Sequence, residues 1–502
     1  MGVRDLWKIT KAATEHETFA TLARTVGSQK APVGARVLVL GVDASIWFCQ
    51  CQSMFVANRA RAGENPALCT MFYRLCWLLK APVLPVFVFD GTGRAEVKRN
   101  RKVGKAEHWL LHKFKKLLRS FAFAYYTAPG EAEAELSKGC ELGVFDAVLT
   151  DDSDALVFGA PRVIRNPNVE KDGDTLRVTS FSSVEAICGL NRSGLVLVSL
   201  LVGNDYAPAG LPGCGAKIAA GLARTPLADG LYNAVTSLSA VMLTEYLSTW
   251  RNDLRHELST NSTGLLPHKC KELASHVSSS FPNVAVVHTL VFPTTSWSNG
   301  ANGRGQRPWE LGRPDLAELA SHCSDWFSWP KRIVLLKFCG QVWDGALFRS
   351  LLLPECLVSP RYCRILPGVR QGDFRRVRYF VGAVRLLTLA GVQDDHNSED
   401  EESAGEGADM ADPSLPTRLV MLPRDIFEPQ VGNGLGDAPE VLTDTTAANE
   451  AASSAALPTG SSDDYIDLTQ DIVDAIEDSD VIDLTHDTDS DVATDSDVEV
   501  LN

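Results

Sequence analysis

Three short apolar runs, each followed by acidic residues, stand out in the first third of the chain. They are VLVLGV before Asp43, VLPVFVF before Asp90, and AVLT before the acidic cluster that holds Asp152 and Asp154. Continuous apolar runs of this length are typical of strands buried in a parallel sheet. Residues 52–80 have the helical spacing of a crossover between the first two strands. The pattern predicts an α/β fold, a twisted and mostly parallel sheet flanked by helices, with acids gathered at one edge.

The stretch from Pro129 to Asp154 combines two acidic groups around the third strand. Glu131 and Glu133 lie about 200° apart on an ideal helix, so they converge more easily at its frayed first turn. Asp152 and Asp154 point the same way if strand geometry continues through Asp154. Together they offer oxygen ligands to hard divalent cations. The alternative is structural, because acids in a first helical turn complement the helix dipole and Asp-rich strand ends form turns.

Later segments predict further elements. LVFGAPRVIRN (156–166) predicts another strand, and a helix over 195–202 ends near Asp205. The turn GLPGCGAK then opens a helix at about Ala216, and such a turn either holds a phosphate on its backbone N–H groups or simply packs two helices. We expect residues 225–330 to be mostly helical, with the amphipathic helix LAELASHCSDWFSW and one extended piece, VAVVHTLVFP. RIVLLKFC (332–339) and VRYFVGAVRLL (377–387) resemble strands.

Charge divides the chain into two bodies of opposite sign. The formal net charge is −15, but residues 393–502 hold 30 Asp and Glu against two Arg, which leaves +13 on residues 1–392. A basic folded part with an acidic tail favours a protein that binds a polyanion and carries an interaction tail. The tail composition cannot bury enough apolar surface to fold alone.

The strongest basic run lies between Arg94 and Arg119, where ten Lys or Arg fall on a segment that we expect to be helical. A solvated helix face is the usual explanation of a charge run. Because this run has one sign and follows an acidic strand end, we favour contact with nucleic-acid phosphates.

Cysteine and hydropathy patterns argue against a zinc-binding, a disulfide-rich or a membrane-spanning protein. The twelve cysteines form no CxxC pair, and no secretory signal follows Met1, so we expect neither a zinc nor a disulfide framework. No apolar run reaches the roughly 18 residues of a membrane helix. We expect a reducing compartment, either cytosol or nucleus, and no membrane partner.

Seven acids stand at predicted strand or helix ends: Asp43, Asp90, Glu131, Glu133, Asp152, Asp154 and Asp205. Convergence of all seven does not follow from the sequence alone. If they converge, their like charges raise one another's pKa unless cations screen them. Two Mg²⁺ ions about 3.5–4 Å apart would resolve this conflict and would support phosphodiester hydrolysis.

A resemblance to a known family rests on six motifs in order. MGVRDLWKI, GVDASIW, VFVFDG, APGEAEAEL, LTDDSDALVFG with VIRN, and LVGNDYAPAGLPGCGAK resemble the flap endonuclease and XPG nuclease superfamily over about residues 1–225. The resemblance implies a Mg²⁺-dependent, structure-specific 5′ nuclease with a PIN-like α/β core and a helix-two turn-helix element. Mn²⁺ would substitute for Mg²⁺.

The family's functional residues carry over by position. The seven carboxylates match its metal ligands, with Asp43, Asp90, Glu131 and Glu133 nearer one ion and Asp152, Asp154 and Asp205 nearer the other. Lys98, Arg99 and Arg101 are the candidates to steer the scissile phosphate, although the motif spacing departs from that of flap enzymes here. The implied DNA contacts are Gly2, Arg94, Lys98, Arg99, Arg101, Lys102, Lys105, Gly210, Gly213, Gly215 and Lys217. The Gly210–Lys217 turn implies a monovalent cation.

Within the family, the sequence is most similar to the fungal GEN/Yen-type Holliday junction resolvases. About 40 residues separate Asp90 from Glu131, fewer than in the arch of flap enzymes, which suits a substrate without a free end. Branched DNA is the implied partner, and a monomer would pair on the junction to make symmetric nicks. A flap or replication-fork nuclease is the enzyme alternative, although no sliding-clamp motif occurs in the tail. An inactive DNA-binding scaffold is the non-enzyme alternative.

These predictions divide the chain into four parts. Residues 1–225 form the nuclease core, 226–330 its helical continuation, 331–392 an accessory module, and 393–502 a disordered acidic tail. The accessory module is either chromodomain-like, as the resemblance implies, or an extension of the core.

The tail contains two short apolar and acidic segments, YIDLT (465–469) and VIDLT (481–485), that resemble SUMO-interacting motifs. Such segments add a strand to a partner's sheet, and chance is the alternative. The implied contacts are Ile466, Leu468, Val481, Ile482 and Leu484. Ser479, Ser490 and Ser496 each precede Asp, so phosphorylation would deepen the charge. We expect a nuclear protein.

Overall fold

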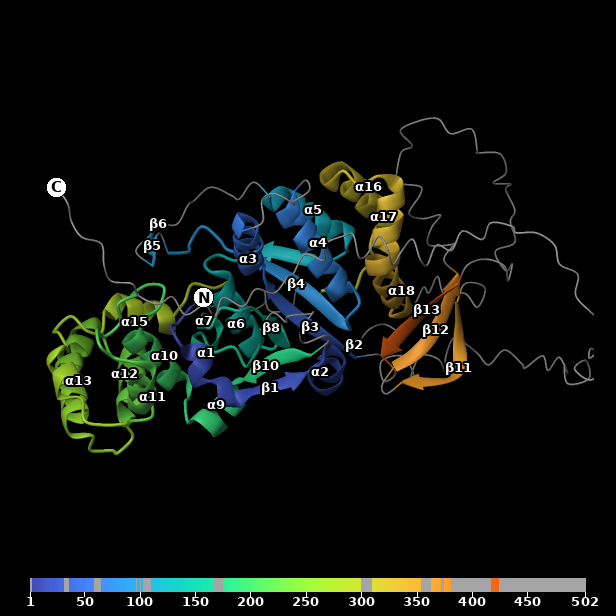
Figure 1. Cartoon of the computed structure of the whole chain (residues 1–502). Coiled ribbons are helices and arrows are strands. Elements are labelled where there is room, and N and C mark those ends of the chain that lie inside the picture. The colour runs from blue at the N-terminus through green and yellow to red at the C-terminus, as the bar shows by residue number, and fades with distance from the viewer. Residues whose placement is uncertain are drawn as a thin grey trace, which may run out of the picture.

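The computed structural model describes residues 2–30, 36–57, 65–95, 97–99, 101–102, 110–165, 175–298, 309–353, 363–371, 374–380 and 417–423. A large sheet lies at the centre, with helices on both of its faces (Figure 1). Its strand order is β1 (Thr14–Glu17), β10 (Leu176–Ser180), β9 (Arg162–Arg165), β8 (Ala147–Leu149), β3 (Arg36–Asp43), β4 (Val83–Phe89) and β7 (Ala124–Thr127), and β2 (Gln29–Lys30) also pairs with β3.

The five strands from β9 to β7 run parallel, whereas β1, β2 and β10 pair antiparallel. This arrangement confirms the predicted mostly parallel sheet. The three predicted strands before the acids are β3, β4 and β8, and they are neighbours in the sheet. Their carboxyl ends therefore meet at one edge.

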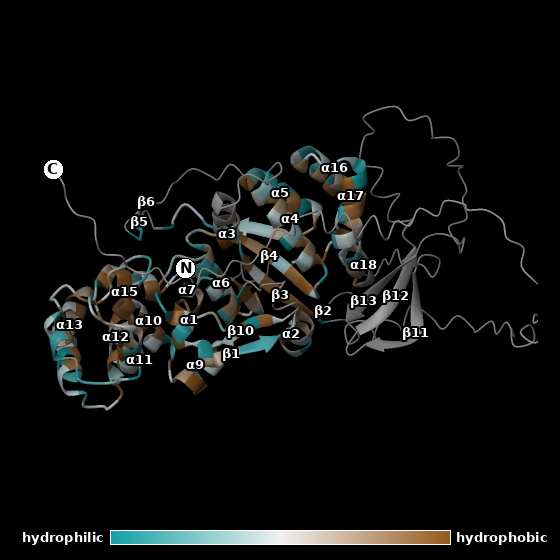
Figure 2. Cartoon of the chain, in the orientation of Figure 1, coloured by the Kyte–Doolittle hydropathy of each residue, from teal (hydrophilic) through white to brown (hydrophobic). Residues whose placement is uncertain are grey.

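Each face of the sheet supports its own core because successive side chains of a strand point to opposite sides. Leu38, Leu40 and Val42 of β3 join one core, and Val39 joins the other. The first core is covered by α2 (Phe19–Val26), α3 (Ala44–Ala57), α4 (Pro66–Leu79), α5 (Leu111–Ser120), α16 (Leu316–Phe327), α17 (Lys331–Lys337), the π-helix Phe338–Val342 and α18 (Trp343–Leu351). Figure 2 shows how hydrophobic residues gather along the central strands and the helix faces that cover them.

The second core holds the remaining helices. They are α1 (Leu6–Ile9), the 3₁₀ turn Lys11–Ala13, α6 (Ala132–Glu141), α7 (Asp154–Val157), α9 (Phe181–Cys188), α10 (Arg192–Val202), α11 (Ala216–Leu222), α12 (Pro226–Ser237), α13 (Ala240–Thr260), α14 (Lys271–Ser275) and α15 (Val284–Val291). The green helices α10 to α15 lie together beside the sheet (Figure 1).

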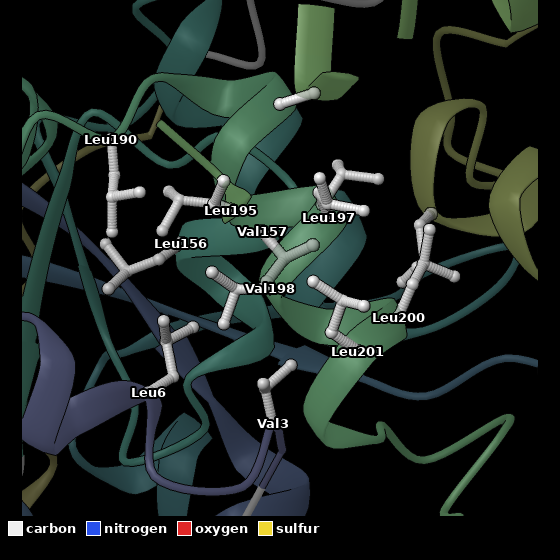
Figure 3. Close-up of a cluster of buried hydrophobic side chains, with 14 of the residues drawn as sticks. Val3, Leu6, Leu156, Val157, Leu190, Leu195, Leu197, Val198, Leu200 and Leu201 are labelled. Carbon is white, nitrogen blue, oxygen red and sulfur yellow. The ribbon is translucent and has the colours of Figure 1, made fainter. Parts of the chain in front are cut away.

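Helix α10 is the hub of this core because all but its first residue is buried. Its Leu and Val side chains lie among those of Leu156 and Val157 on α7 and those of Val3 and Leu6 near the N-terminus (Figure 3). The N-terminal segment and the loop before α7 are thus fixed on one scaffold.

Two segments predicted as extended are helices. Residues 284–291 form α15, since the Asn283 side chain accepts hydrogen bonds from the backbone N–H groups of Ala285 and Val286 at 3.0 and 3.4 Å and so caps the helix. The predicted strand 332–339 is α17 with the start of the π-helix, in which Val334 and Phe338 are buried one turn apart. Short apolar runs of this length are compatible with a strand or a buried helix, and here tertiary packing favours the helix.

The basic segment is only partly helical. Val97–Lys98 (β5) and Arg101–Lys102 (β6) pair as a short hairpin, and among the described residues of this segment only Leu111–Ser120 forms a helix. Arg99 has a φ of 49°, in the left-handed region, where a chain reverses direction. The prediction of one helical segment was therefore wrong here.

Later elements refine the predicted domain limits. Helices α17 and α18 pack into the first core, so residues 331–351 continue the body built on the large sheet. A separate antiparallel sheet comprises β11 (Cys363–Gln371), β12 (Phe374–Phe380) and β13 (Thr417–Pro423), drawn in orange in Figure 1. Strand β13 lies inside the segment that we predicted to be disordered, because the local run LVML is apolar although the tail as a whole is not.

Candidate metal centre

The sheet edge carries the acids where the sequence predicts them. Asp43 is the last residue of β3, and Asp90 directly follows β4. Strand β8 ends at Leu149, and Asp154 begins α7, so Asp152 and Asp154 lie on a turn rather than on a continued strand. We expected these two side chains to point the same way only if the strand continued through Asp154, and it does not. The turn between them is held by the Asp154 N–H, which donates to Asp152 Oδ1 at 2.9 Å.

Asp43 is buried and anchored on both oxygens. Its Oδ1 accepts from the backbone N–H groups of Ser45 and Ile46 at 3.0 and 3.3 Å. Its Oδ2 accepts from the Thr150 hydroxyl at 3.1 Å, and the same hydroxyl oxygen accepts from the Asp152 N–H at 3.1 Å. Thr150 therefore joins the ends of β3 and β8.

Helix α6 brings the two glutamates to the same edge. Glu131 is its N-cap residue, and Glu133 lies in its first turn, which confirms the predicted position at a helix start. Asp90 Oδ1 accepts from the Ala132 N–H at 2.9 Å, so the end of β4 is tied to the start of α6. Glu131 and Glu133 are both buried.

The third acid of the EAEAE run has a different role. Glu135 is fully buried, and its two oxygens accept from the Tyr126 hydroxyl at 3.2 Å and from the Ser296 N–H at 2.7 Å. One oxygen thus fastens the 293–298 segment onto α6, and the other ties α6 to β7. Glu135 is therefore structural.

Asp205 and Gly2 complete the cluster from distant parts of the chain. Asp205 follows α10 and is buried. A Cβ at Gly2 would come 2.1 Å from Asp152 Oδ1 and 2.6 Å from Asp154 Oδ1, and Gly2 has a φ of 79°. The N-terminal backbone thus lies directly against two of the acids, and only glycine fits there.

Three basic side chains pair with the cluster. Lys98 Nζ lies 3.0 Å from Glu131 Oε1 and 4.0 Å from Glu133 Oε1. Arg99 Nε donates to Asp205 Oδ1 at 2.7 Å, and Arg94 lies 3.3 Å from Asp90 Oδ2. We predicted that Lys98, Arg99 and Arg94 contact phosphates. In this structure each of them forms an ion pair with an acid of the cluster.

Burial and like charge disfavour ionised carboxylates here. Burial, together with the charges of Asp90 and Asp152, raises the pKa of Asp43 to about 7. Burial also raises the pKa of Glu133 and of Asp154 well above their usual values, and that of Asp152 is raised for the same reason. Such a site demands compensating cations.

The acids are the right type of ligand for divalent cations, but in this structure they are not grouped closely enough to hold one. Glu133 Oε2 and Asp154 Oδ1 are buried and accept no hydrogen bond from the described residues. Carboxylate oxygens are what Mg²⁺ and Mn²⁺ prefer. Across the described ranges, no three acidic, His or Cys side chains are grouped closely enough to hold one ion. Lys98 stands between Glu131 and Glu133, so binding an ion requires this lysine to move.

The glycine-rich turn lies between α10 and α11, as predicted. Gly210 and Gly213 have φ values of 54° and 89°, and a Cβ at Gly210 would meet Leu201 O at 2.5 Å. Nothing lies within 4 Å of a Cβ built at Gly215, and Lys217 is exposed. The turn thus presents exposed backbone, with the positively charged side chain of Lys217 beside it.

Other predicted contacts are less defined. Arg101 and Lys102 form β6, and Lys105 lies outside the described residues, as do the tail positions Ile466, Leu468, Val481, Ile482 and Leu484. No single described helix could span a membrane, although α9 and α10, bent by 78°, pass by length and composition as a pair.

The sequence did not indicate two residues of this site, Tyr206 and Thr150. The Tyr206 hydroxyl donates to Glu131 Oε2, and the Thr150 hydroxyl binds Asp43. Both stand next to a predicted acid or strand end, but nothing in the sequence indicates which carboxylate each would reach.

Comparisons with known proteins show which family the chain resembles. The XPG N-terminal domain matches residues 1–108, and the XPG I-region matches residues 122–205. Human flap endonuclease GEN homolog 1 is 30% identical over 233 residues, which is 43% of this chain and 24% of the human protein. The chain thus spans about a quarter of the length of this curated relative.

Solved structures extend the similarity to most of the fold. The eukaryotic junction-resolving enzyme GEN-1 with caesium matches with a TM-score of 0.67 at 26% identity, over 86% of this chain and 97% of that one. The Holliday junction-resolving enzyme GEN1 with product DNA and Mg²⁺ matches over the same shares with a TM-score of 0.65 and 26% identity.

Proposed function

This chain belongs to the XPG nuclease family, and from that premise we propose that it is a Mg²⁺-dependent, structure-selective DNA endonuclease that resolves four-way junctions. The observation that carries the proposal is the buried cluster of acids at the carboxyl edge of the parallel sheet. Its raised pKa values call for cations, and the buried oxygens Glu133 Oε2 and Asp154 Oδ1 have no hydrogen-bond partner among the described residues. The similarity to enzymes that resolve junctions, over 86% of this chain, supports the substrate.

The ligands fall into two groups. Asp43, Asp90, Glu131 and Glu133 would hold one ion, and Asp152, Asp154 and Asp205 the other. Two bound Mg²⁺ or Mn²⁺ ions would supply an activated water and would stabilise the leaving oxygen of the phosphodiester. Thr150 and the backbone after Asp43 fix the carboxylate of Asp43 before any ion arrives.

The basic residues next to the acids would orient the DNA. Lys98 and Arg99 reach the cluster from the β5–β6 hairpin, so they are placed to meet a phosphate that enters it. Arg101, Lys102 and Lys105 follow on the same segment. We assign these residues to phosphate contact and Lys98 and Arg99 to the scissile phosphate itself, because a phosphate that replaces their carboxylate partners keeps their charges paired.

The turn Gly210–Lys217 would bind the duplex at a distance from the cut. Its backbone is exposed at Gly213 and Gly215, with open space around Gly215, and Lys217 adds a positive charge. A monovalent cation on this turn would neutralise phosphates on the bound strand. The related enzyme solved with caesium supports such a site.

Resolution requires two opposed cuts, so two copies would act on one junction. The short spacer between Asp90 and Glu131 favours a junction over a threaded flap. We expect the purified chain with Mg²⁺ to cut an intact four-way junction symmetrically. Cutting of 5′ flaps or forks with intact junctions left whole would contradict the junction assignment, and absence of any metal-dependent cutting would favour a scaffold.

The acidic tail would recruit the enzyme in the nucleus. YIDLT and VIDLT would each add a strand to SUMO. We expect changes of Ile466, Leu468, Ile482 and Leu484 to Ala to abolish capture by immobilised SUMO while junction cleavage is unchanged. Undiminished SUMO capture by this variant would contradict the proposal.

A further inference from the structure

Tyr206 makes a contact with the metal centre that the sequence does not suggest. Its hydroxyl donates to Glu131 Oε2, 75 residues earlier in the chain, and its ring packs against the second core. We propose that Tyr206 is a positioning residue that holds Glu131 in its ion-binding orientation. The inference rests on the proposed metal-dependent function and deepens it.

The two oxygens of Glu131 have separate partners, which is what such a role requires. Oε2 accepts from Tyr206, whereas Oε1 faces Lys98 Nζ at 3.0 Å on the cluster side. Glu131 makes no side-chain hydrogen bond to its own helix, although it occupies the N-cap position. If Lys98 withdraws, Oε1 is exposed to an incoming ion while Tyr206 still holds Oε2. Outer hydrogen bonds of this kind orient metal-binding carboxylates.

Tyr206 is itself held by a rigid loop. Asn204 Oδ1 accepts from the N–H groups of Tyr206 and Ala207 at 2.9 and 2.8 Å, and Asn204 Nδ2 donates to Ser199 O of α10 at 3.3 Å. Asn204 is buried. The hydroxyl therefore reaches Glu131 from a loop fixed to the end of the buried helix α10, rather than from a free surface loop.

The same loop connects three functional elements. It carries Asp205, holds Glu131 through Tyr206, and continues into the Gly210–Lys217 turn. Gly210 is locked into it, since its N–H donates to Ala207 O at 3.1 Å and the Leu211 N–H donates to Leu201 O at 2.9 Å. The position of Glu131 is thus tied to the element proposed to grip the duplex.

Helix α6 offers a matched control. The Tyr126 hydroxyl donates to Glu135 Oε1 at 3.2 Å, another Tyr–Glu hydrogen bond, on the same helix one turn further along. Glu135 faces the 293–298 segment and not the acid cluster. Tyr126→Phe therefore removes an equivalent bond without touching a proposed ligand.

The test measures Mn²⁺ affinity by calorimetry on the full chain without DNA, for the wild type, Tyr206→Phe and Tyr126→Phe. We expect Tyr206→Phe to weaken binding ~10-fold, as loss of an outer-shell hydrogen bond does elsewhere, and Tyr126→Phe to leave it unchanged. Cleavage by Tyr206→Phe should recover as Mg²⁺ is raised. Equal affinity in the wild type and Tyr206→Phe, or an equal loss in both variants, would overturn the role.

A double-mutant cycle keeps the role testable if the Phe variant is globally weakened. In a Glu131→Gln background, Tyr206→Phe should add no further loss of Mn²⁺ affinity, because the two changes act through one contact. Additive losses would overturn the inference and leave the proposed function standing. A wild type that binds no Mn²⁺ would overturn both.

Discussion

Lys98 Nζ lies 3.0 Å from Glu131 Oε1, where a metal ion would have to bind. Burial alone would lower the pKa of Lys98, but the carboxylates of Glu133 and Glu131 outweigh it and raise that pKa, so the side chain is charged. A lysine at this position neutralises buried acids when no ion is present. If the acids bind ions as proposed, Lys98 competes with those ions for Glu131.

This competition predicts opposite effects of one substitution. Lys98→Gln should raise Mn²⁺ affinity ~10-fold in the absence of DNA, a fraction of the ~4 kcal/mol between two charges 4 Å apart near a protein surface. It should lower cleavage, because the phosphate loses its steering charge. Calorimetry and single-turnover cleavage measure the two effects.

Lys138→Gln is the matched control, since Lys138 pairs with Glu141 at 3.2 Å on the exposed side of α6. It should change neither quantity. Unchanged or weaker Mn²⁺ binding by Lys98→Gln would contradict the competition.

The stability of the metal-free protein should depend on pH through Asp43. Its pKa is raised from 3.8 to about 7, chiefly by burial, so the folded state favours the protonated carboxyl. This contribution is fully present below about pH 4 and is lost as pH rises through about 7. Thermal unfolding with chelator should therefore show a falling Tm over this window.

Added Mg²⁺ should oppose that fall, because it stabilises the ionised acids, and Asp43→Asn should flatten it. If the metal-free Tm rose steadily from pH 4 to 7 and Asp43→Asn left that slope unchanged, the assigned burial effect would be wrong.

Sequence patterns predicted the acid edge because each element there combines a long apolar run with an acid at its end. Asp43 and Asp90 needed only this local signal and the parallel order of the strands, whereas Glu131 stands at the start of a helix. Three features were beyond it. The hairpin turns at Arg99 by a left-handed backbone, α15 depends on the cap at Asn283, and the Tyr206 hydrogen bond joins residues 75 positions apart. Such features depend on tertiary packing, which periodicity does not encode.

Arg349 should anchor the last helix of the core. Its side chain is 2% exposed, and its guanidinium donates to Leu79 O at 3.3 Å and Leu78 O at 3.1 Å, at the end of α4. Arg349→Met keeps the apolar stem but removes the guanidinium donor from both carbonyls. We expect a loss of about 1–3 kcal/mol in the free energy of unfolding.

Chemical denaturation measures this loss. Arg36→Met is the control, because Arg36 also donates to a carbonyl, Arg24 O at 3.5 Å, but from an exposed position. Equal stability of the two variants would show that the buried contact contributes nothing.

Lys217→Ala should separate DNA binding from metal binding. Lys217 is exposed on the glycine-rich turn, and the seven acids lie elsewhere. Removing one phosphate contact should weaken junction binding and reduce the slope of log K against log salt by about 1. Mn²⁺ affinity should be unchanged; an unaltered salt slope would exclude Lys217 from the DNA interface.

The most direct test of the metal centre is to measure binding and cleavage of an intact four-way junction, with and without Mg²⁺, for the wild type, Asp152→Asn and Glu141→Gln. Asp152 is a buried member of the cluster, whereas Glu141 is exposed on α6. We predict that all three proteins bind the junction, that the wild type and Glu141→Gln cut it only with Mg²⁺, and that Asp152→Asn does not cut. Full cleavage by Asp152→Asn, or cleavage by the wild type without a divalent ion, would contradict it.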